Sequence, residues 1–292
     1  MLRLRNEAIG DPATHLAKTG NIIRRRESVD GVNEISAYLR GLRLPVPVEY
    51  DVVYHGAINE IRGYSYNELM RGIQVYPVGS RWNGMLFDAT AGWQDEDDRI
   101  AREMMARNGD KYVMECPRNA ERPDKVVFLP GTNMLGFVDG DELGRLVARG
   151  FVIKPHPLTE ERCLHSLRGR YGHKVVLGRR VSGFWLYQGA REVASIRNTE
   201  FGVLALLEGK PWYEILAYSP RDRVDVAYKR FYDLALSSEA FATTPGGMIR
   251  RALNCPHSGL VFPWQVDWKD RLRAFFDLFA DYPHGRPETD GK

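Results

Sequence analysis

The chain has few cysteines, and their spacing does not suit a metal site. Among its 292 residues are three cysteines, Cys116, Cys163 and Cys255. An odd number of distant cysteines argues against a disulfide framework and gives none of the short Cys and His spacings typical of zinc sites. We therefore expect a protein of a reducing compartment, the cytoplasm, whose fold depends on hydrophobic cores.

Long hydrophobic runs are also lacking. No apolar stretch approaches the roughly 18 residues that a membrane-spanning helix requires, and the first residues lack the apolar segment of a secretion signal. We expect no transmembrane segment. A large excess of charge of one sign is lacking too, because the formal net charge of +3 at pH 7 is far from that of a protein that packages nucleic acid.

What the sequence does contain is apolar runs that alternate with helix-like segments. In the first half, strands are expected at 49–58, 73–79, 111–116 and 125–131, and helices at 66–71 and 97–108. In the second half, strands are expected at 151–157, 173–178 and 192–197, and helices at 141–150, 160–171, 184–189, 199–209 and 266–282.

This alternation predicts an α/β protein built of βα units, since parallel strands need crossovers that cover both faces of the sheet. The length suits two domains. We expect two Rossmann-like domains that face a cleft. A basic helical arm at 1–45 precedes an N-terminal domain at 46–130 and a C-terminal domain at 131–292, which ends in a helix with one apolar face.

Polar residues follow two strands of the second half. The segment 154–157 (KPHP) ends one apolar run, and the segment 197–199 (RNT) ends another, just before a helix that contains Gly202. Ligands of open parallel sheets bind beyond the carboxyl ends of the strands, and a helix N-terminus attracts phosphate. The alternatives are a rigid turn that faces water and an ordinary helix cap. If the two strands are adjacent, both segments face one site for an anion.

Two stretches carry a family resemblance. Taken together, "FVIKPHP" and "REVASIRNTEFGVLALLEGKPWY" resemble the capsule-polysaccharide type of GT-B glycosyltransferase, the group of the Kdo and bacterial sialic acid transferases. Those enzymes have a strand ending in "(K/R)xHP" and a segment like "ADEVxTxxSxxGFEALLxGKPV". The matching positions are Lys154, His156, Pro157, Asn198, Thr199, Gly202, Ala205, Leu206, Leu207, Gly209, Lys210 and Pro211.

The likeness covers mainly residues 111–213. In "KYVMECP", Glu115 falls on an acidic position of the family. Two departures are Thr199, where the family has serine, and Leu204, where it has glutamate; the family's "EDGF" is "ECPR" here.

The resemblance implies a metal-independent GT-B enzyme that moves a sugar from a nucleotide-sugar donor, bound by the C-terminal domain, to a hydroxyl of a glycan bound by the N-terminal domain. No cofactor beyond this co-substrate is expected. His156 is the expected catalytic contact to the donor phosphate. Further donor-binding candidates are Lys154, Asn198, Thr199, Gly202, Arg180, Arg197 and Lys210. The base that takes the acceptor proton is expected from the first domain, with Glu115, His55 and Asp88 as candidates. The acidic run at 95–98 (DEDD) favours a solvated helix start over a metal site.

Other functions stay open at this point. A phage-type glycosyltransferase that modifies a hydroxylated base in DNA would explain the basic and aromatic residues of 79–87, 166–180 and 24–26. A non-catalytic module that binds a nucleotide-sugar would explain Leu204 in place of the family's glutamate. An epimerase has a similar fold and a similar donor, but its usual acids and histidines are lacking here.

Overall fold

A computed structural model gives the arrangement of most of the chain. It describes residues 34–35, 37–39, 41–42, 59–61, 64–69, 72–77, 99–107, 109, 114–117, 120–197, 199–216, 232 and 246–280. The predictions that concern His55, Asp88, Asn198, the arginines at 24–26 and the acidic run at 95–98 lie outside these residues.

The chain forms two compact units. The first, the parallel-sheet unit, includes residues 108–247, and the second, the antiparallel-sheet unit, includes residues 26–107 and 248–292. This division differs from the predicted boundary between residues 130 and 131. Glu115 and the strand that begins at Lys125 belong to the same unit as residues 131–247. The backbone of Glu115 pairs with that of Arg180 and Ser182 in this unit.

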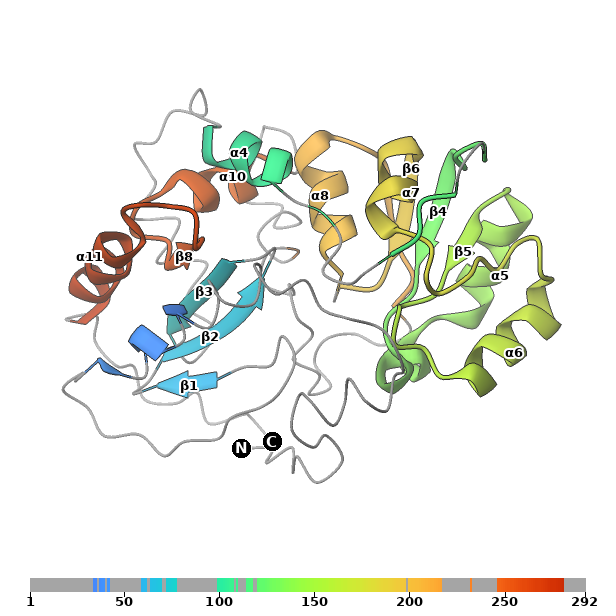
Figure 1. The fold of residues 1–292 in the computed structure, drawn as a ribbon, viewed down its shortest axis with the longest axis horizontal. Helices are drawn as coiled ribbons and strands as arrows, with labels where there is room; N and C mark the ends of the chain where they lie inside the picture. Colours follow the sequence, from blue (N-terminus) through green and yellow to red (C-terminus); the bar gives the residue numbers. More distant parts are fainter. Residues whose placement is uncertain are drawn as a thin grey trace, which may run out of the picture. The chain divides into compact units, whose positions relative to one another are not determined.

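Four parallel strands form the sheet of the first unit (Figure 1). They are β4 (Lys125–Phe128), β5 (Val152–Lys154), β6 (Glu192–Ser195) and β7 (Trp212–Glu214), in the spatial order β5-β4-β6-β7. The helices between them are η1 (Thr132–Phe137), α5 (Gly140–Ala148), α6 (Glu161–Tyr171), α7 (Gly183–Gly189) and α8 (Glu200–Glu208). The α/β class is therefore confirmed for this unit.

Side chains of the parallel strands alternate between two cores, as the pleat of a strand requires. Val127, Ile153 and Ala194 join Leu146 of α5 and Leu164 of α6 in one core. On the other face, Phe128 of β4 stacks on Phe201 of α8, and Phe201 also meets Phe184 of α7. The sheet is thus covered by helices on both faces, with α7 and α8 on the side to which Phe128 points.

Local signals in the sequence explain where these helices begin and end. Asp139 accepts hydrogen bonds from the N–H groups of Asp141 and Glu142 at the start of α5, and these bonds lower its pKa. Helix α8 ends at Gly209, which has φ +71°. Glycine tolerates this left-handed conformation without the steric cost of a side chain.

The second unit holds an antiparallel sheet. Its strands are β1 (Asn59–Ile61), β2 (Tyr64–Leu69), β3 (Gly72–Pro77) and β8 (Leu260–Val261), in the order β1-β2-β3-β8. The predicted helix at 66–71 is wrong, since most of it is strand β2. The described strands of this unit also do not form the parallel, Rossmann-like sheet that was expected of the N-terminal domain.

The core of the antiparallel-sheet unit lies between strand β3 and helix α11 (Trp268–Ala280), and Ile35 and Leu39 also belong to it. The unit contains helices α4 (Arg99–Arg107) and α10 (Gly247–Asn254) as well. Trp268, Leu272, Phe275 and Phe276 of α11 pack against Ile73 and Val75 of β3, which confirms the predicted apolar face of the terminal helix. Among the described residues, no helix is both long and apolar enough to cross a membrane.

Candidate functional site

The order of the parallel strands marks one place on the sheet for a ligand. From β4 the chain passes through α5 to β5 on one side, and from β6 it passes through α8 to β7 on the other side. Strands β4 and β6 are neighbours, so the connections diverge between them. Open parallel sheets bind ligands at such a switch point, beyond the carboxyl ends of the strands. The segments at this point are 129–132 and 196–199.

The two predicted segments reach the same edge of the sheet but do not come from adjacent strands. Lys154 of β5 and Ser195 of β6 both lie opposite Phe128, one on each side of β4. The expectation of adjacent strands is therefore wrong. Because neighbouring strands are about 4.8 Å apart, the ends of β5 and β6 lie about 10 Å apart, which is within the span of a nucleotide.

His156 lies in a tight turn just after β5. Its Nδ1 accepts a hydrogen bond from the N–H of Leu158 at 3.1 Å, and its carbonyl accepts one from the N–H of Thr159 at 2.9 Å. In the neutral imidazole, an accepting Nδ1 requires that the proton is on Nε2. The turn therefore orients the half-buried ring and makes Nε2 a hydrogen-bond donor.

Lys154 is buried beside this turn, with 3% of its surface exposed. Its ammonium group donates to the carbonyl of Pro155 and, at 3.0 Å, to the carbonyl of Arg179. The charge thus ties the end of β5 to the segment near residue 179. The predicted contact of Lys154 with a donor phosphate stays a prediction.

Thr199 caps helix α8. Its Oγ1 accepts from the N–H of Phe201 at 3.4 Å, so the ordinary capping role is present, and a ligand at this helix start stays a prediction. Gly202 does not leave open space beside its Cα. A Cβ there would lie 2.7 Å from Nε1 of Trp212 and 2.8 Å from Oγ of Ser195, and closer still to the hydroxyl of Tyr232. Glycine at this position admits protein side chains.

Arg197 follows β6 and forms a two-pronged ion pair with Glu214, the last residue of β7. Its Nη2 lies 2.8 Å from Oε2 of the carboxylate, and its Nε bonds Oε1. The two side chains are mostly buried, with 18% and 29% exposed. Glu214 was missed by the sequence analysis, although its place at the end of a strand is the signal that could have found it.

Glu115 and Arg180 come together in an exposed ion pair, with 3.2 Å between Oε1 and Nε. Glu115 was expected from the other domain across a cleft, but it lies in the same unit as His156. Lys210 precedes β7, and therefore lies toward the amino end of the sheet, where its ammonium group bonds Glu208 and the carbonyl of Tyr187. Burial, and then the hydrogen bond to Glu208, raise the pKa of Tyr187.

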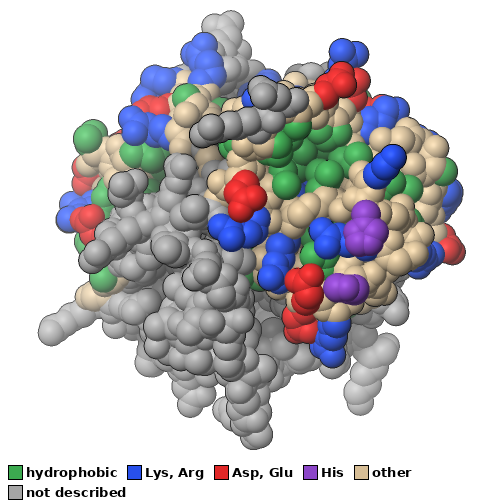
Figure 2. Space-filling view, turned by 45° about the vertical axis from the view of Figure 1, so that its right-hand side comes forward, with side chains coloured by type: hydrophobic (Ala, Val, Ile, Leu, Met, Phe, Trp, Pro, Cys, Tyr) green, Lys and Arg blue, Asp and Glu red, His purple; other side chains and the backbone are tan. Residues whose placement is uncertain are grey.

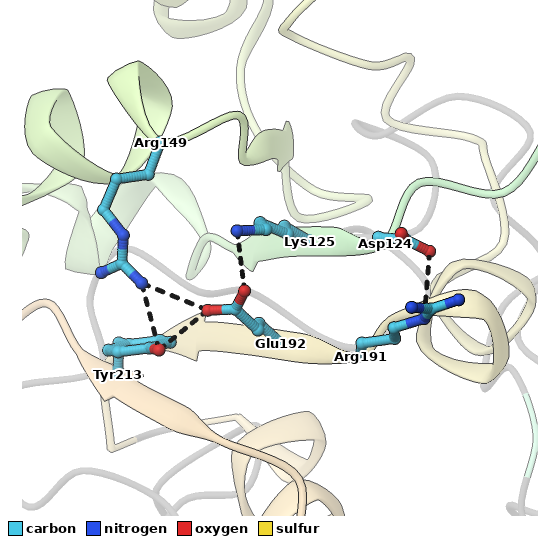
Figure 3. A network of polar contacts seen from close by, with 6 residues as sticks. All are labelled: Asp124, Lys125, Arg149, Arg191, Glu192 and Tyr213. Carbon is cyan, nitrogen blue, oxygen red and sulfur yellow. Dashed lines mark hydrogen bonds and ion pairs between the residues drawn. The ribbon is translucent and has the colours of Figure 1, made fainter.

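A second polar network lies at the opposite edge of the sheet (Figure 3). Lys125 and Glu192, the first residues of β4 and β6, are 2.7 Å apart. Tyr213 donates to Glu192 at 2.8 Å, and Arg149 bonds both of them. The hydrogen bond from Lys125 and the one from Tyr213 lower the pKa of Glu192. Every charge of this network has a partner, so it is better suited to stabilising the sheet than to binding an anion.

Among the described residues, no group of three or more His, Cys, Asp and Glu side chains is arranged to hold a metal ion. No protein-family model matches the chain, and no curated protein matches it either.

Proposed function

We propose that the chain is a glycosyltransferase that binds a nucleotide-sugar at the carboxyl edge of the parallel sheet and transfers the sugar to a glycan hydroxyl. One observation carries the proposal. The pairing of both β5 and β6 with β4 brings the His156 turn and the N-terminus of α8 to one edge of the sheet, and the N-terminus of α8 lies at its switch point. In a GT-B arrangement this unit would be the donor-binding domain.

The chemistry needs stabilisation of a phosphate leaving group. As the acceptor oxygen bonds the anomeric carbon, the bond from that carbon to the phosphate oxygen breaks, and the electron pair leaves with the phosphate. The Nε2–H of His156 and the amides at the start of α8 would supply fixed positive potential at that oxygen. These groups make a metal ion unnecessary for this step. Of the candidates for the base that takes the acceptor proton, Glu115 is the described one, although it lies in the same unit as His156 and forms an ion pair with Arg180.

A nucleotide screen tests the proposal. The full chain is heated with CMP, UDP, GDP, ADP or inorganic phosphate, and the melting temperature is compared with that of the free protein. A ligand that binds only the folded state at a hundred times its Kd stabilises it by about 2.7 kcal/mol. We expect stabilisation by at least one nucleotide, and hydrolysis of the matching nucleotide-sugar without an acceptor. Binding without hydrolysis would favour a non-catalytic module, and no binding at all would reject the proposal.

DNA is the second candidate for the acceptor. Exposed basic residues are frequent in α6 and in the segment 172–180 that follows it. They are Arg162, His165, Arg170, His173, Lys174 and Arg180. Acidic side chains lie among the basic ones on the face that Figure 2 shows, so attraction to DNA would be moderate. Retention of a DNA duplex in a mobility-shift assay at physiological salt would favour DNA over a glycan.

A further inference from the structure

We infer that Tyr232 is a positioning residue for the phosphate site at the start of α8. The inference rests on the proposed function, because it concerns the same site. Tyr232 is completely buried, and its hydroxyl donates to the carbonyl oxygen of Thr199 at 2.7 Å. It lies outside both motifs of the family resemblance.

The hydrogen bond acts on the peptide group that begins the helix. The carbonyl of Thr199 and the N–H of Glu200 belong to one planar unit and point in opposite directions. The direction in which Tyr232 holds the carbonyl therefore also determines the direction of the N–H of Glu200. This N–H is among the first amides of α8, the groups that a bound phosphate would contact.

The ring of Tyr232 is itself held in place by the sheet. Its centroid lies 4.8 Å from that of Trp212, at an interplanar angle of 36°. The indole N–H of Trp212 donates at 2.9 Å to Oγ of Ser195, the last residue of β6. Gly202, in the first turn of α8, gives these three side chains the room they need. The connection from β6 to α8 is thus held by side-chain hydrogen bonds at both ends, from Trp212 to Ser195 and from Tyr232 to Thr199.

Core packing alone would give the same buried ring, so the test must separate the hydroxyl from the ring. Tyr232→Phe removes only the hydroxyl and leaves the contact with Trp212. Tyr213→Phe is the matched control. Its hydroxyl is hydrogen-bonded as well, to Glu192 and Arg149, but it lies at the opposite edge of the same sheet (Figure 3).

The experiment measures the Kd of the full chain for UDP, CMP, GDP and ADP, and for the four matching nucleosides, which lack the phosphate. For whichever pair the wild type binds, we expect Tyr232→Phe to weaken nucleotide binding about threefold to tenfold, the effect of one net hydrogen bond. Nucleoside binding should not change, and Tyr213→Phe should change neither value. The melting temperatures of the two unliganded variants should be similar.

The outcomes separate the inference from the proposed function. If the wild type binds none of the four nucleotides, the proposed function fails and the inference fails with it. If the wild type binds a nucleotide and Tyr232→Phe binds it equally well, only the inference is overturned. An equal loss of nucleotide and nucleoside binding, with a lower melting temperature, would show a purely structural role. Should Tyr232→Phe not fold, Ser195→Ala tests the same link by removing the acceptor of Trp212, and the same phosphate-selective loss is expected.

Discussion

Nδ1 of His156 accepts a hydrogen bond from the N–H of Leu158, two residues further along the chain. The imidazole therefore has two separable roles. Nδ1 stabilises the turn that follows β5, and Nε2 is the donor that the proposed phosphate contact requires. Substitutions that imitate only one of the two nitrogens can measure each role by itself.

We predict that His156→Asn keeps the fold and loses the ligand. The Oδ1 of asparagine can replace Nδ1 as the acceptor for Leu158, so the free energy of unfolding should stay within about 0.5 kcal/mol of the wild-type value. The position of Nε2 is left empty, and nucleotide affinity should fall about tenfold or more. Urea unfolding and calorimetric titration with the nucleotide found in the screen check the two parts.

His156→Gln is the complementary variant. Its amide reaches the position of Nε2 but leaves the N–H of Leu158 without its acceptor. It should therefore retain more affinity than His156→Asn while losing about 0.5–1.5 kcal/mol of stability. Equal affinity of the wild type and both variants would contradict the proposed contact.

Gly202→Ala should destabilise the parallel-sheet unit. The added Cβ would meet Trp212 and Ser195 at distances below 3 Å, and the neighbouring Tyr232 is fully buried. Overpacking of this kind costs about 1–3 kcal/mol. Gly144→Ala in α5 is the control, because a Cβ there meets nothing within 4 Å, and in a helix alanine is favoured over glycine by about 0.5–1 kcal/mol. Thermal unfolding should therefore shift in opposite directions for the two variants.

Most elements of the parallel-sheet unit could be predicted from the sequence because their signals are local, but β7 and η1 were not expected. Short apolar runs gave β4, β5 and β6, and glycines marked the ends of α5 and α8. The expected strand at 173–178 was an exception, since in the structure only an isolated bridge joins Val176 to Ile153. Its apolar residues pack beside β5 without extending the sheet as a regular strand.

The segment 64–69 (YSYNEL) shows how a short pattern misleads. Tyr64 and Tyr66 alternate with polar residues, which is the period of a strand, and aromatic residues favour strands. The expected βα alternation suggested a helix there. Its pairing with β3 is antiparallel over all six residues, a relationship that no local signal of the segment specifies.

The sequence could predict where the candidate site lies but not the contacts between its side chains. The two motifs gave the strand ends that the sheet brings to one edge. The burial of Lys154, the ion pair of Arg197 with Glu214, and the packing of Tyr232 against Gly202 all join residues from different elements. Such contacts depend on tertiary packing, so spacing in the sequence could not reveal them.

Arg271 should be essential for the stability of the antiparallel-sheet unit. It is 7% exposed, and its Nη2 donates to the carbonyls of Leu253 and Cys255 at the end of α10, at 3.1 and 2.9 Å. Burial lowers its pKa. Arg271→Met would leave two buried carbonyls without these bonds, at a cost of about 1–3 kcal/mol. Arg273→Met, on the exposed side of the same helix, should change the urea midpoint little, and equal effects would contradict this role.

The network in Figure 3 should make the stability depend on acid. The hydrogen bond from Lys125, followed by that from Tyr213, lowers the pKa of Glu192 in the folded protein. A carboxyl group whose pKa is lower in the folded state stabilises the fold above its unfolded pKa, and the contribution is lost as the pH falls through the folded value. Glu192→Gln should therefore be less stable than the wild type near neutral pH, by less than about 1 kcal/mol, as for other solvent-accessible ion pairs.

The difference in the free energy of unfolding between the two proteins should shrink once the pH falls below 4.5, the ordinary pKa of glutamate. The wild-type carboxylate is then increasingly protonated and, like the glutamine, carries no charge. Asp124→Asn is the control, since the pair of Asp124 and Arg191 is exposed and 3.7 Å apart. Its loss should leave the pH profile of urea unfolding unchanged. A difference between wild type and Glu192→Gln that persists in acid would mean that the side chain acts through packing, because a contribution from its charge must vanish when the charge is neutralised.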